Sequence, residues 1–187
     1  MNISAVLLAG GKSRRMGKDK ATLLFCGNPL WEIQLELLRK LEPAEILISA
    51  RTDPSWRPPA MLFVRDDPPS RGPLSGLTAA LARIQTAHLL ALAIDMPFMS
   101  EDYLRAISNE IEPGCGVLPM IGDRAEPLAA IYPAHAHVDL VAALSGVEFS
   151  LQRLTNKLVK AGKLRVHRVR KEEEELFRNL NAPPDLD

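Results

Sequence analysis

The sequence predicts a single α/β domain, built on a Rossmann-like, doubly wound and mostly parallel sheet that is flanked by helices. The length of 187 residues suits one domain with its own core, and the chain has no internal repeat and no low-complexity linker. Strand-like apolar runs are separated by segments of helical period. The runs are continuously apolar, which is typical of parallel strands covered on both faces. They are Ile3–Leu8, Glu45–Ser49, Met61–Val64 and Leu89–Ile94.

Two helices are expected among these strands. One is predicted over Pro29–Leu41, because a proline suits the first turn of a helix, and the next over Pro73–Ile84. Each carries apolar residues that recur on one face. The expected stripes are Ile33, Leu37 and Leu41 in the first helix and Leu77, Leu81 and Ile84 in the second.

The second half of the chain continues the domain. A helix over Glu101–Asn109 precedes two extended pieces around the turn-like Gly122-Asp123, and two helical patterns follow. The later pattern carries leucines on one face and stops at Gly162, which suits a helix C-terminus. The remaining expected features are the extended pieces Gly116–Met120 and Pro127–Tyr132, the leucine face Leu151, Leu154 and Leu158, the strand Leu164–Val169, and an acidic solvated helix start at Glu172–Glu175.

Composition and charge exclude several classes of function. The 23 basic and 23 acidic residues balance, so the chain has no global positive field for a nucleic-acid backbone. Its apolar runs are far shorter than the roughly 20 residues that span a bilayer, and its start lacks the pattern of an export signal. Cys26 and Cys115 form no CxxC pair. His135 and His137, two residues apart, do not share a helical face, and no third ligand for a metal ion is apparent beside them. We expect a cytoplasmic monomer without a nucleic-acid or membrane partner.

The loop after the first strand is the strongest local feature. Ala9, Gly10 and Gly11 are small enough for the backbone to turn tightly and for its N–H groups to approach an anion. From Lys12 to Lys20 the chain then carries five basic residues and one acid, Asp19. The spacing fits neither the Walker phosphate loop, because five residues separate Gly11 from Gly17, nor the dinucleotide fingerprint. The sequence therefore predicts a triphosphate-binding loop of another kind.

This loop, L-A-G-G-x-S-R-R-M-G-x-D-K-A, resembles the signature of the molybdenum cofactor guanylyltransferases, the MobA type of nucleotidyltransferase. The resemblance implies a nucleotide-diphospho-sugar transferase-like fold and, with magnesium, transfer of GMP from GTP to the phosphate of molybdopterin with release of pyrophosphate. It implies that Leu8, Ala9 and Gly10 hold the guanine end, and that Gly11, Arg15 and Lys20 hold the phosphates. Related cytidylyltransferases favour L-A-A-G, so Gly10 favours guanine.

Two aspartates follow strands, where an open α/β sheet places its ligands. Asp95 ends a central apolar run and begins Asp95-Met96-Pro97-Phe98, so it is the expected Mg²⁺ ligand, since one carboxylate with phosphate oxygens and water suits this ion. The segment from Asp66 to Leu77 resembles the family pattern D-x-x-P-x-x-G-P-L-x-G-L, which implies that Asp66 contacts the nucleotide. Ser49 stands where some relatives have an asparagine for the nucleotide, and its hydroxyl can still donate and accept.

The second half resembles the part of the family that faces the acceptor. Arg124, in Gly122–Tyr132, could bind a phosphate through two parallel hydrogen bonds. Asn179 and Asn181, in an N-x-N-x-P pattern, could read a pterin ring with their amide edges. Arg153 is a further candidate for the acceptor pocket.

These residues divide the single domain, 1–187, into a nucleotide-binding half, 1–100, and an acceptor-binding half, 101–187. The function implied is formation of molybdopterin guanine dinucleotide from GTP and molybdopterin, with Arg15, Lys20 and Asp95 as catalytic residues. Proteins that make molybdopterin or that receive the cofactor are the partners implied. The alternatives are a cytidylyl- or sugar-phosphate nucleotidyltransferase of the same fold, and a non-catalytic nucleotide- or cofactor-binding accessory protein.

Overall fold

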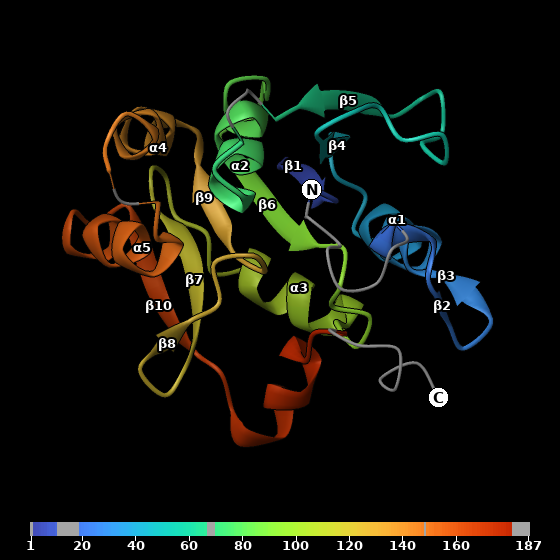
Figure 1. The fold of residues 1–187 in the computed structure, drawn as a ribbon. Helices are drawn as coiled ribbons and strands as arrows, with labels where there is room; N and C mark the ends of the chain where they lie inside the picture. The colour runs from blue at the N-terminus through green and yellow to red at the C-terminus, as the bar shows by residue number, and fades with distance from the viewer. Residues whose placement is uncertain (1, 11–18, 67–69, 148, 181–187) are drawn as a thin grey trace.

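A central sheet forms the middle layer of the protein (Figure 1). Its strand order is β10-β7-β9-β6-β1-β4-β5, with β8 paired to β7. The structure is a computed structural model, and it describes residues 2–10, 19–66, 70–147 and 149–180. The strands of the sheet are β1 (Ser4–Leu8), β4 (Glu45–Ala50), β5 (Leu62–Arg65), β6 (His88–Ala93), β7 (Gly116–Ile121), β8 (Arg124–Ala125), β9 (Ile131–Pro133) and β10 (Leu164–Arg168). Among the described strands of this sheet most pairs are parallel, whereas β8 and β9 run antiparallel to their neighbours. The predicted mostly parallel α/β sheet is confirmed.

Helices cover both faces of this sheet. Figure 1 shows α1 and α3 on one side and α2, α4 and α5 on the other. The α-helices are α1 (Leu30–Lys40), α2 (Pro73–Leu81), α3 (Glu101–Ser108), α4 (His137–Leu144) and α5 (Leu151–Lys160). Shorter elements are the 3-10 helices η1 (Lys20–Thr22), η2 (Ala134–Ala136) and η3 (Lys171–Phe177), and the hairpin of β2 (Leu24–Phe25) with β3 (Asn28–Pro29).

The continuously apolar strands supply both cores because successive side chains point to opposite faces. In β1, Ala5 and Leu7 pack with α1 and α3, whereas Val6 and Leu8 pack with α2, α4 and α5. Every residue of β1 and β6 is buried. Both faces of these strands are therefore apolar, so the sequence shows no alternation of polar and apolar residues. Alternate residues of each strand nevertheless belong to different cores.

Two sequence expectations need correction in their details. In α1 the fully buried residues are Leu30, Gln34, Leu35 and Leu38, whereas Ile33 and Leu37 are half-buried. The helix turns another of its faces toward the sheet than the predicted one. More than one face of this leucine-rich helix is apolar, so the apolar pattern alone did not identify the buried face. The extended piece Pro127–Tyr132 is a strand only from Ile131, although Ala91 and Ala93 still donate to backbone oxygens of Ala130 and Leu128.

The expected ends of the later helices are confirmed. Ser100 caps α3 by accepting a hydrogen bond from the N–H of Tyr103 at 3.2 Å, and Gly162 follows α5 with a φ of +70°.

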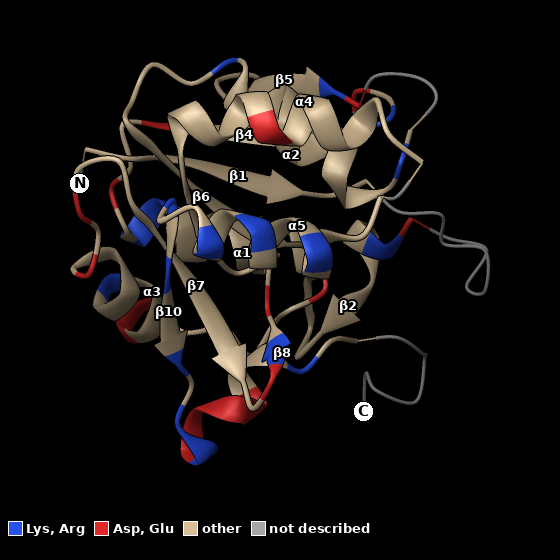
Figure 2. Ribbon diagram, turned by 90° about the vertical axis from the view of Figure 1, so that its left-hand side faces the viewer, with Lys and Arg blue, Asp and Glu red and all other residues tan. Residues whose placement is uncertain are grey.

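The acidic run forms η3, at the red foot of the molecule in Figure 2, and basic residues mark α5 in the same view. Both cysteines are free. Within the ranges that the structure describes, no helix has the length and apolarity to span a bilayer.

Candidate active site

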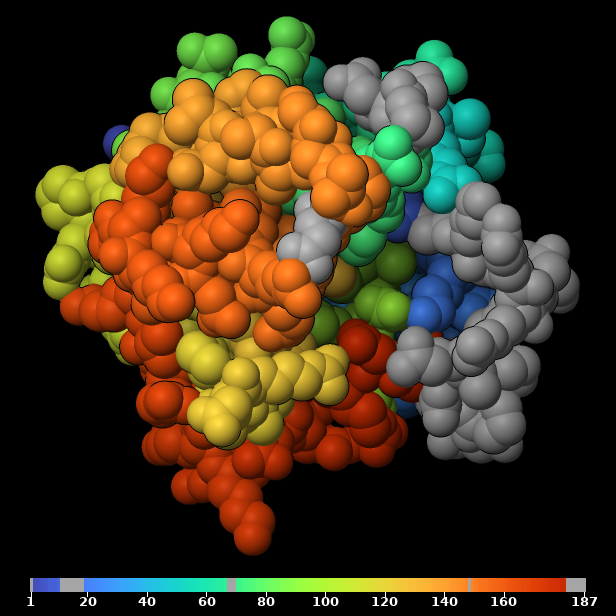
Figure 3. All heavy atoms as spheres, turned by 60° about the vertical axis from the view of Figure 1, so that its left-hand side comes forward, coloured from blue at the N-terminus to red at the C-terminus, as the bar shows by residue number. Residues whose placement is uncertain are grey.

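The carboxyl ends of three adjacent strands meet at one edge of the sheet. Leu8 at the end of β1 is in register with Ser49 of β4 on one side and with Ala93 of β6 on the other. The loops that follow remain joined, because the N–H of Ala9 donates to the oxygen of Ser49 at 2.8 Å and that of Ile94 to Leu8 at 3.2 Å. In Figure 3 the surface is hollowed here, with green atoms on the floor between the orange helices and the blue start of the chain. This edge gathers Gly10, Asp66 and Asp95, as the sequence predicted.

Lys20 and Asp95 form an ion pair at this edge. Lys20 opens η1, and its Nζ lies 2.7 Å from Oδ2 of Asp95, one residue beyond Ile94. The side chains are 23% and 22% exposed, so the pair is half-buried and still accessible to a substrate. The two residues are 75 positions apart in the chain. The structure thus brings together two of the three predicted catalytic residues.

A pair of tryptophans holds the turn from which Lys20 projects. Asp19 caps η1 by accepting from the N–H of Ala21 at 3.1 Å, and its other oxygen accepts from Nε1 of Trp56, also at 3.1 Å. Trp56 lies in the segment between β4 and β5, and its ring stacks on Trp31 of α1 at 5.6 Å between centroids. Sequence reasoning missed this contact, because nothing in the irregular segment 51–61 indicated a partner for the loop.

Ser49, Asp66 and two glycines form a close-packed niche beside the ion pair. The hydroxyl of Ser49 donates to Oδ1 of Asp66 at 2.7 Å, and both residues are buried. A Cβ on Gly10 would lie 2.6 Å from Oδ2 of Asp66, and a Cβ on Gly76 of α2 would lie 2.5 Å from Oγ of Ser49. Such separations are too short for carbon and oxygen, so both glycines are needed for the present position of Asp66. The structure places Ser49 as a support for Asp66.

The predicted acceptor residue Arg124 lies on the β7–β8 hairpin. Strands β6 and β7 both pair antiparallel with β9, so they point the same way and the hairpin emerges at the edge that holds Asp95. The side-chain amide of Gln152, on α5, bonds both the N–H of Ala125, at 3.0 Å, and its carbonyl oxygen, at 2.6 Å. Beside it, Arg153 lines a cavity of about 360 Å³ between α4 and α5, together with Asp139 and Lys157.

Glu126 is a buried carboxylate on the same hairpin that sequence reasoning did not single out. Its side chain is 6% exposed, and Oε1 lies 3.3 Å from Nε of Arg124, whose side chain is 71% exposed. Burial raises the pKa of the Glu126 carboxyl above its usual range, and Arg124 opposes part of that shift. The only signal in the sequence was an acid next to Pro127, in a turn where acids are ordinarily solvated.

The last described residues return to Asp95. Phe177 at the end of η3 packs edge-on against Tyr103 at 5.2 Å, and the guanidinium of Arg178 lies 4.2 Å from the ring centroid of Phe98. The N–H of Leu180 then donates to the backbone oxygen of Asp95 at 2.9 Å. Between them lies Asn179, whose Oδ1 is buried and has no hydrogen-bond partner in the part of the protein that is described.

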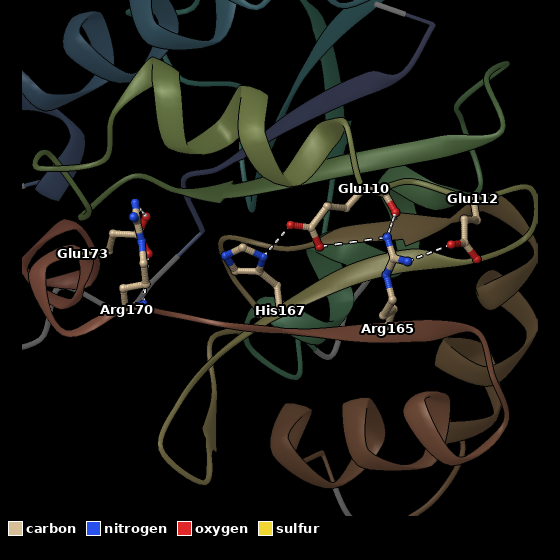
Figure 4. A network of polar contacts seen from close by, with 6 residues as sticks. All are labelled: Glu110, Glu112, Arg165, His167, Arg170 and Glu173. Atoms are coloured by element: carbon tan, nitrogen blue, oxygen red, sulfur yellow. Dashed lines mark hydrogen bonds and ion pairs between the residues drawn. The ribbon is translucent and has the colours of Figure 1, made fainter.

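A polar network anchors the strand that leads to this arm (Figure 4). Nδ1 of His167 lies 2.7 Å from Oε1 of Glu110, and Nη1 of Arg165 lies 2.7 Å from Oε1 of Glu112. These contacts tie β10 to the loop after α3. The Asn179 segment is therefore held in place by contacts on both sides of η3.

Three predicted site residues, Gly11, Arg15 and Asn181, lie outside the described residues. Arg153 lines the cavity between α4 and α5, and Leu8 and Ala9 lie at the end of β1. Most of the other described site residues form two groups. Lys20, Asp95, Gly10, Asp66 and Ser49 are in the first group, while Arg124 and Asn179 approach from the hairpin and the terminal arm.

The side chains at this edge suit some metal ions and not others. No cluster of three or more His, Cys, Asp or Glu side chains occurs among the described residues. Asp95 supplies one half-exposed carboxylate, which fits an ion such as Mg²⁺ that takes few protein ligands and several from phosphates and water. It does not fit a structural zinc ion, which needs a closed set of four ligands.

Residues 5–163 match the family described as "MobA-like NTP transferase domain". A probable molybdenum cofactor guanylyltransferase from Opitutus terrae is 35% identical, with 99% of this chain and 93% of that protein covered. The molybdenum cofactor guanylyltransferase of Cereibacter sphaeroides is 34% identical, with 100% and 94% covered.

Solved structures agree with this match. The molybdopterin-guanine dinucleotide biosynthesis protein A from Archaeoglobus fulgidus superposes with a TM-score of 0.79 at 26% identity, covering 98% of this chain and 94% of that one. A nucleotidyl transferase from Methanothermobacter thermautotrophicus shares the fold, with a TM-score of 0.76 at 17% identity over 98% and 93% of the two chains.

Proposed function

The chain belongs to the MobA-like NTP transferase family, and from this premise we propose that it transfers GMP from GTP to molybdopterin, which forms molybdopterin guanine dinucleotide and releases pyrophosphate. The observation that carries the proposal is the Lys20–Asp95 ion pair, set beside the Gly10–Asp66 niche at the carboxyl edge of the sheet. A lysine and a carboxylate at this place suit a reaction in which negatively charged phosphates must be held and turned toward each other.

The reaction joins two phosphates. A phosphate oxygen of molybdopterin attacks the α-phosphorus of GTP, the new P–O bond forms, and the bond from the α-phosphorus to the bridging oxygen breaks, so that its electrons leave with pyrophosphate. The attacking oxygen is already ionised at neutral pH, so no general base is required. Positioning and charge stabilisation therefore supply the rate enhancement.

Lys20 is the cation that the ion pair with Asp95 holds at the strand edge. We propose that its ammonium group binds phosphate oxygens of GTP while Asp95 keeps the group at the strand edge. Arg15, in the loop outside the described residues, is proposed to share the charge of the departing pyrophosphate. Loss of either cation removes a preorganised charge, which typically costs about 10²- to 10³-fold in rate.

Asp95 is the proposed ligand of a Mg²⁺ ion. The ion, when bound, supplies positive charge to the triphosphate and to the leaving pyrophosphate. The role of the chain is to hold the carboxylate rigidly: β6 fixes its backbone, Lys20 fixes one oxygen, and the N–H of Leu180 fixes the peptide oxygen.

We propose that Asp66 contacts the guanine nucleotide from the niche, with Ser49 holding its carboxylate. Leu8, Ala9 and Gly10 would line the same side. Because any Cβ at position 10 would press on Asp66, Gly10 supports guanine binding by leaving this carboxylate in place.

The proposal is tested on purified protein with Mg²⁺ and each nucleoside triphosphate in turn. A ligand at a hundred times its dissociation constant adds about 2.7 kcal/mol of stability, which for a domain of this size raises the melting temperature by roughly 5 to 10 °C. GTP should give this shift, and pyrophosphate should appear only after molybdopterin is added. Replacing Mg²⁺ with EDTA should abolish the release of pyrophosphate.

The same assay separates the alternatives. A shift with CTP and none with GTP would replace guanylyl by cytidylyl transfer. Release of pyrophosphate with a sugar phosphate, and none with molybdopterin, would replace the acceptor. GTP binding without any release would indicate an accessory protein.

A further inference from the structure

We propose that Glu126 is a positioning residue for acceptor binding: its buried carboxylate fixes Arg124 so that the outer edge of the guanidinium receives the phosphate of the acceptor. This inference rests on the proposed function for the identity of the acceptor. It assigns a role to a residue that the nucleotide chemistry does not use.

The first step is the place of the hairpin. The strand β7 runs in the same direction as β6, so the β7–β8 turn extends past the edge at which Asp95 lies. Gln152 clamps the backbone of Ala125 from α5, and Arg168 of β10 donates to the oxygen of Gly122. The backbone on both sides of Arg124 is therefore held by elements that are remote in sequence.

The second step is the burial of Glu126. Its N–H donates to the oxygen of Pro119 at 2.9 Å, and only 6% of its side chain is exposed. A carboxylate in such a place loses hydration that one ion pair replaces only in part. The raised pKa of Glu126 has the same cause. Burial of this acid thus lowers the stability of the fold rather than increasing it, and a role other than stability is indicated.

The third step is the geometry of Arg124. A guanidinium carries five N–H donors, of which the Nε group supplies one. Because the ion pair with Glu126 engages Nε at 3.3 Å, the four N–H bonds of the two Nη groups remain for an incoming anion. With 71% of the side chain exposed, this edge is accessible. A phosphate takes two parallel hydrogen bonds from such an edge, and a fixed fork loses less entropy on binding than a free one.

The test compares the wild type with Glu126→Gln, Arg124→Ala and the double variant. Glutamine keeps the size of the side chain and removes its charge. We expect Glu126→Gln to raise the KM and the dissociation constant for molybdopterin about tenfold, or about 1.4 kcal/mol, to leave the KM for GTP unchanged, and to melt at the same or a higher temperature. Glu112→Gln is the matched control, because Glu112 also pairs with an arginine, Arg165, at 2.7 Å but lies in the network after α3.

The double variant distinguishes positioning from a direct contact. If Glu126 acts through Arg124, then Glu126→Gln should add no further loss of acceptor affinity to Arg124→Ala. Arg124→Ala alone should also lower the melting temperature, since it leaves a buried carboxylate without its partner, and the second substitution should restore it.

Three results would overturn the inference: unchanged acceptor affinity in Glu126→Gln, full additivity of the two substitutions, or a parallel fall in melting temperature and in affinity for both substrates. Failure of the proposed function has a different signature. If the wild type transfers no GMP to molybdopterin, the proposed function is contradicted. The dissociation constants for molybdopterin would still report on the pair of Arg124 and Glu126. A wild type that does not bind molybdopterin overturns both.

Discussion

The two sides of the candidate active site are built in different ways. On the nucleotide side, Lys20 pairs with Asp95 and Ser49 with Asp66. All four lie at the ends of four neighbouring strands, β6, β1, β4 and β5, or in the loop that follows β1. On the acceptor side, Arg124 is 71% exposed, and Oδ1 of Asn179 has no partner within the described residues. The sheet register preorganises the first group, whereas contacts from α5, β10 and η3 position the second. Substitutions on the nucleotide side should therefore affect the rate most, and those on the acceptor side should affect affinity.

The largest effect is expected from Asp95→Asn. The amide keeps the shape but loses the charge that pairs with Lys20 and that would hold Mg²⁺, so transfer should fall by about 10³-fold or more. Pyrophosphate release under single-turnover conditions measures this. The matched control is Asp139→Asn, because Asp139 forms a similar pair with Lys163 at 2.6 Å on α4. Equal losses in the two variants would contradict a special role for the strand edge.

Lys20→Ala should come next, with a loss of about 10²- to 10³-fold in kcat/KM for GTP. The lysine is the cation proposed to bind the triphosphate, and alanine removes the ammonium group that lies 2.7 Å from Asp95. Lys163→Ala removes the corresponding lysine of the control pair and should leave turnover within about twofold of the wild type. Full turnover of Lys20→Ala at saturating GTP would show that the loop after β1 has another role.

Gly10→Ala should weaken GTP binding about tenfold, or about 1.4 kcal/mol. The new Cβ would lie 2.6 Å from Oδ2 of Asp66, so the carboxylate must move away from its hydrogen bond with Ser49. The melting shift with GTP should shrink, and that with CTP should be equal or larger. Gly76→Ala presses on Ser49 and the same carboxylate from α2 and should reduce the GTP shift as well. A Gly10→Ala protein with the GTP shift of the wild type would remove Asp66 from the base site.

The same contrast explains what the sequence could predict. Asp95 and Asp66 were predicted at one edge because each follows an apolar strand, and parallel strands end together. Ser49, the last residue of its predicted strand, was singled out by the family resemblance. The ion pair of Lys20 with Asp95 was not predicted, although the same rule explains it, since the loop after β1 starts beside β6.

Other contacts had no local signal. The irregular segment 51–61 gave no reason to place Trp56 on Asp19, and the two-residue strand β8 gave none to bury Glu126. The stripe of α1 was misassigned because leucines on adjacent rows gave more than one apolar face. These features depend on side chains that meet across long stretches of chain, and periodicity carries no information about such meetings.

A smaller effect is expected from Trp56→Phe, about two- to fivefold in kcat/KM. Phenylalanine can keep the stack on Trp31, but it lacks the Nε1–H that donates to Asp19 at 3.1 Å, and one hydrogen bond of this kind is worth about 1 kcal/mol. The matched control is Trp31→Phe, which keeps that bond. The chain has only these two tryptophans, so the tryptophan fluorescence of each variant also reports directly on the contact between Trp56, Trp31 and Asp19. An equal loss in both variants would assign the effect to the stack rather than to Asp19.

The smallest effect, on stability alone, concerns the pH dependence of the difference between the wild type and Glu126→Gln. Burial places the folded pKa of Glu126 above its usual 4.5, and the charge of Arg124 opposes part of that shift. Well below pH 4.5 the acid is protonated in both the folded and the unfolded chain, so it carries no penalty there. As the pH rises from the unfolded to the folded pKa, the unfolded chain loses its proton first, and the wild type loses stability relative to the glutamine variant. Melting curves of both proteins across this range should therefore diverge with rising pH, while all other titrating groups cancel in the comparison. A difference that stays constant would mean that Arg124 fully compensates the buried charge, and the acceptor side would then be as completely paired as the nucleotide side.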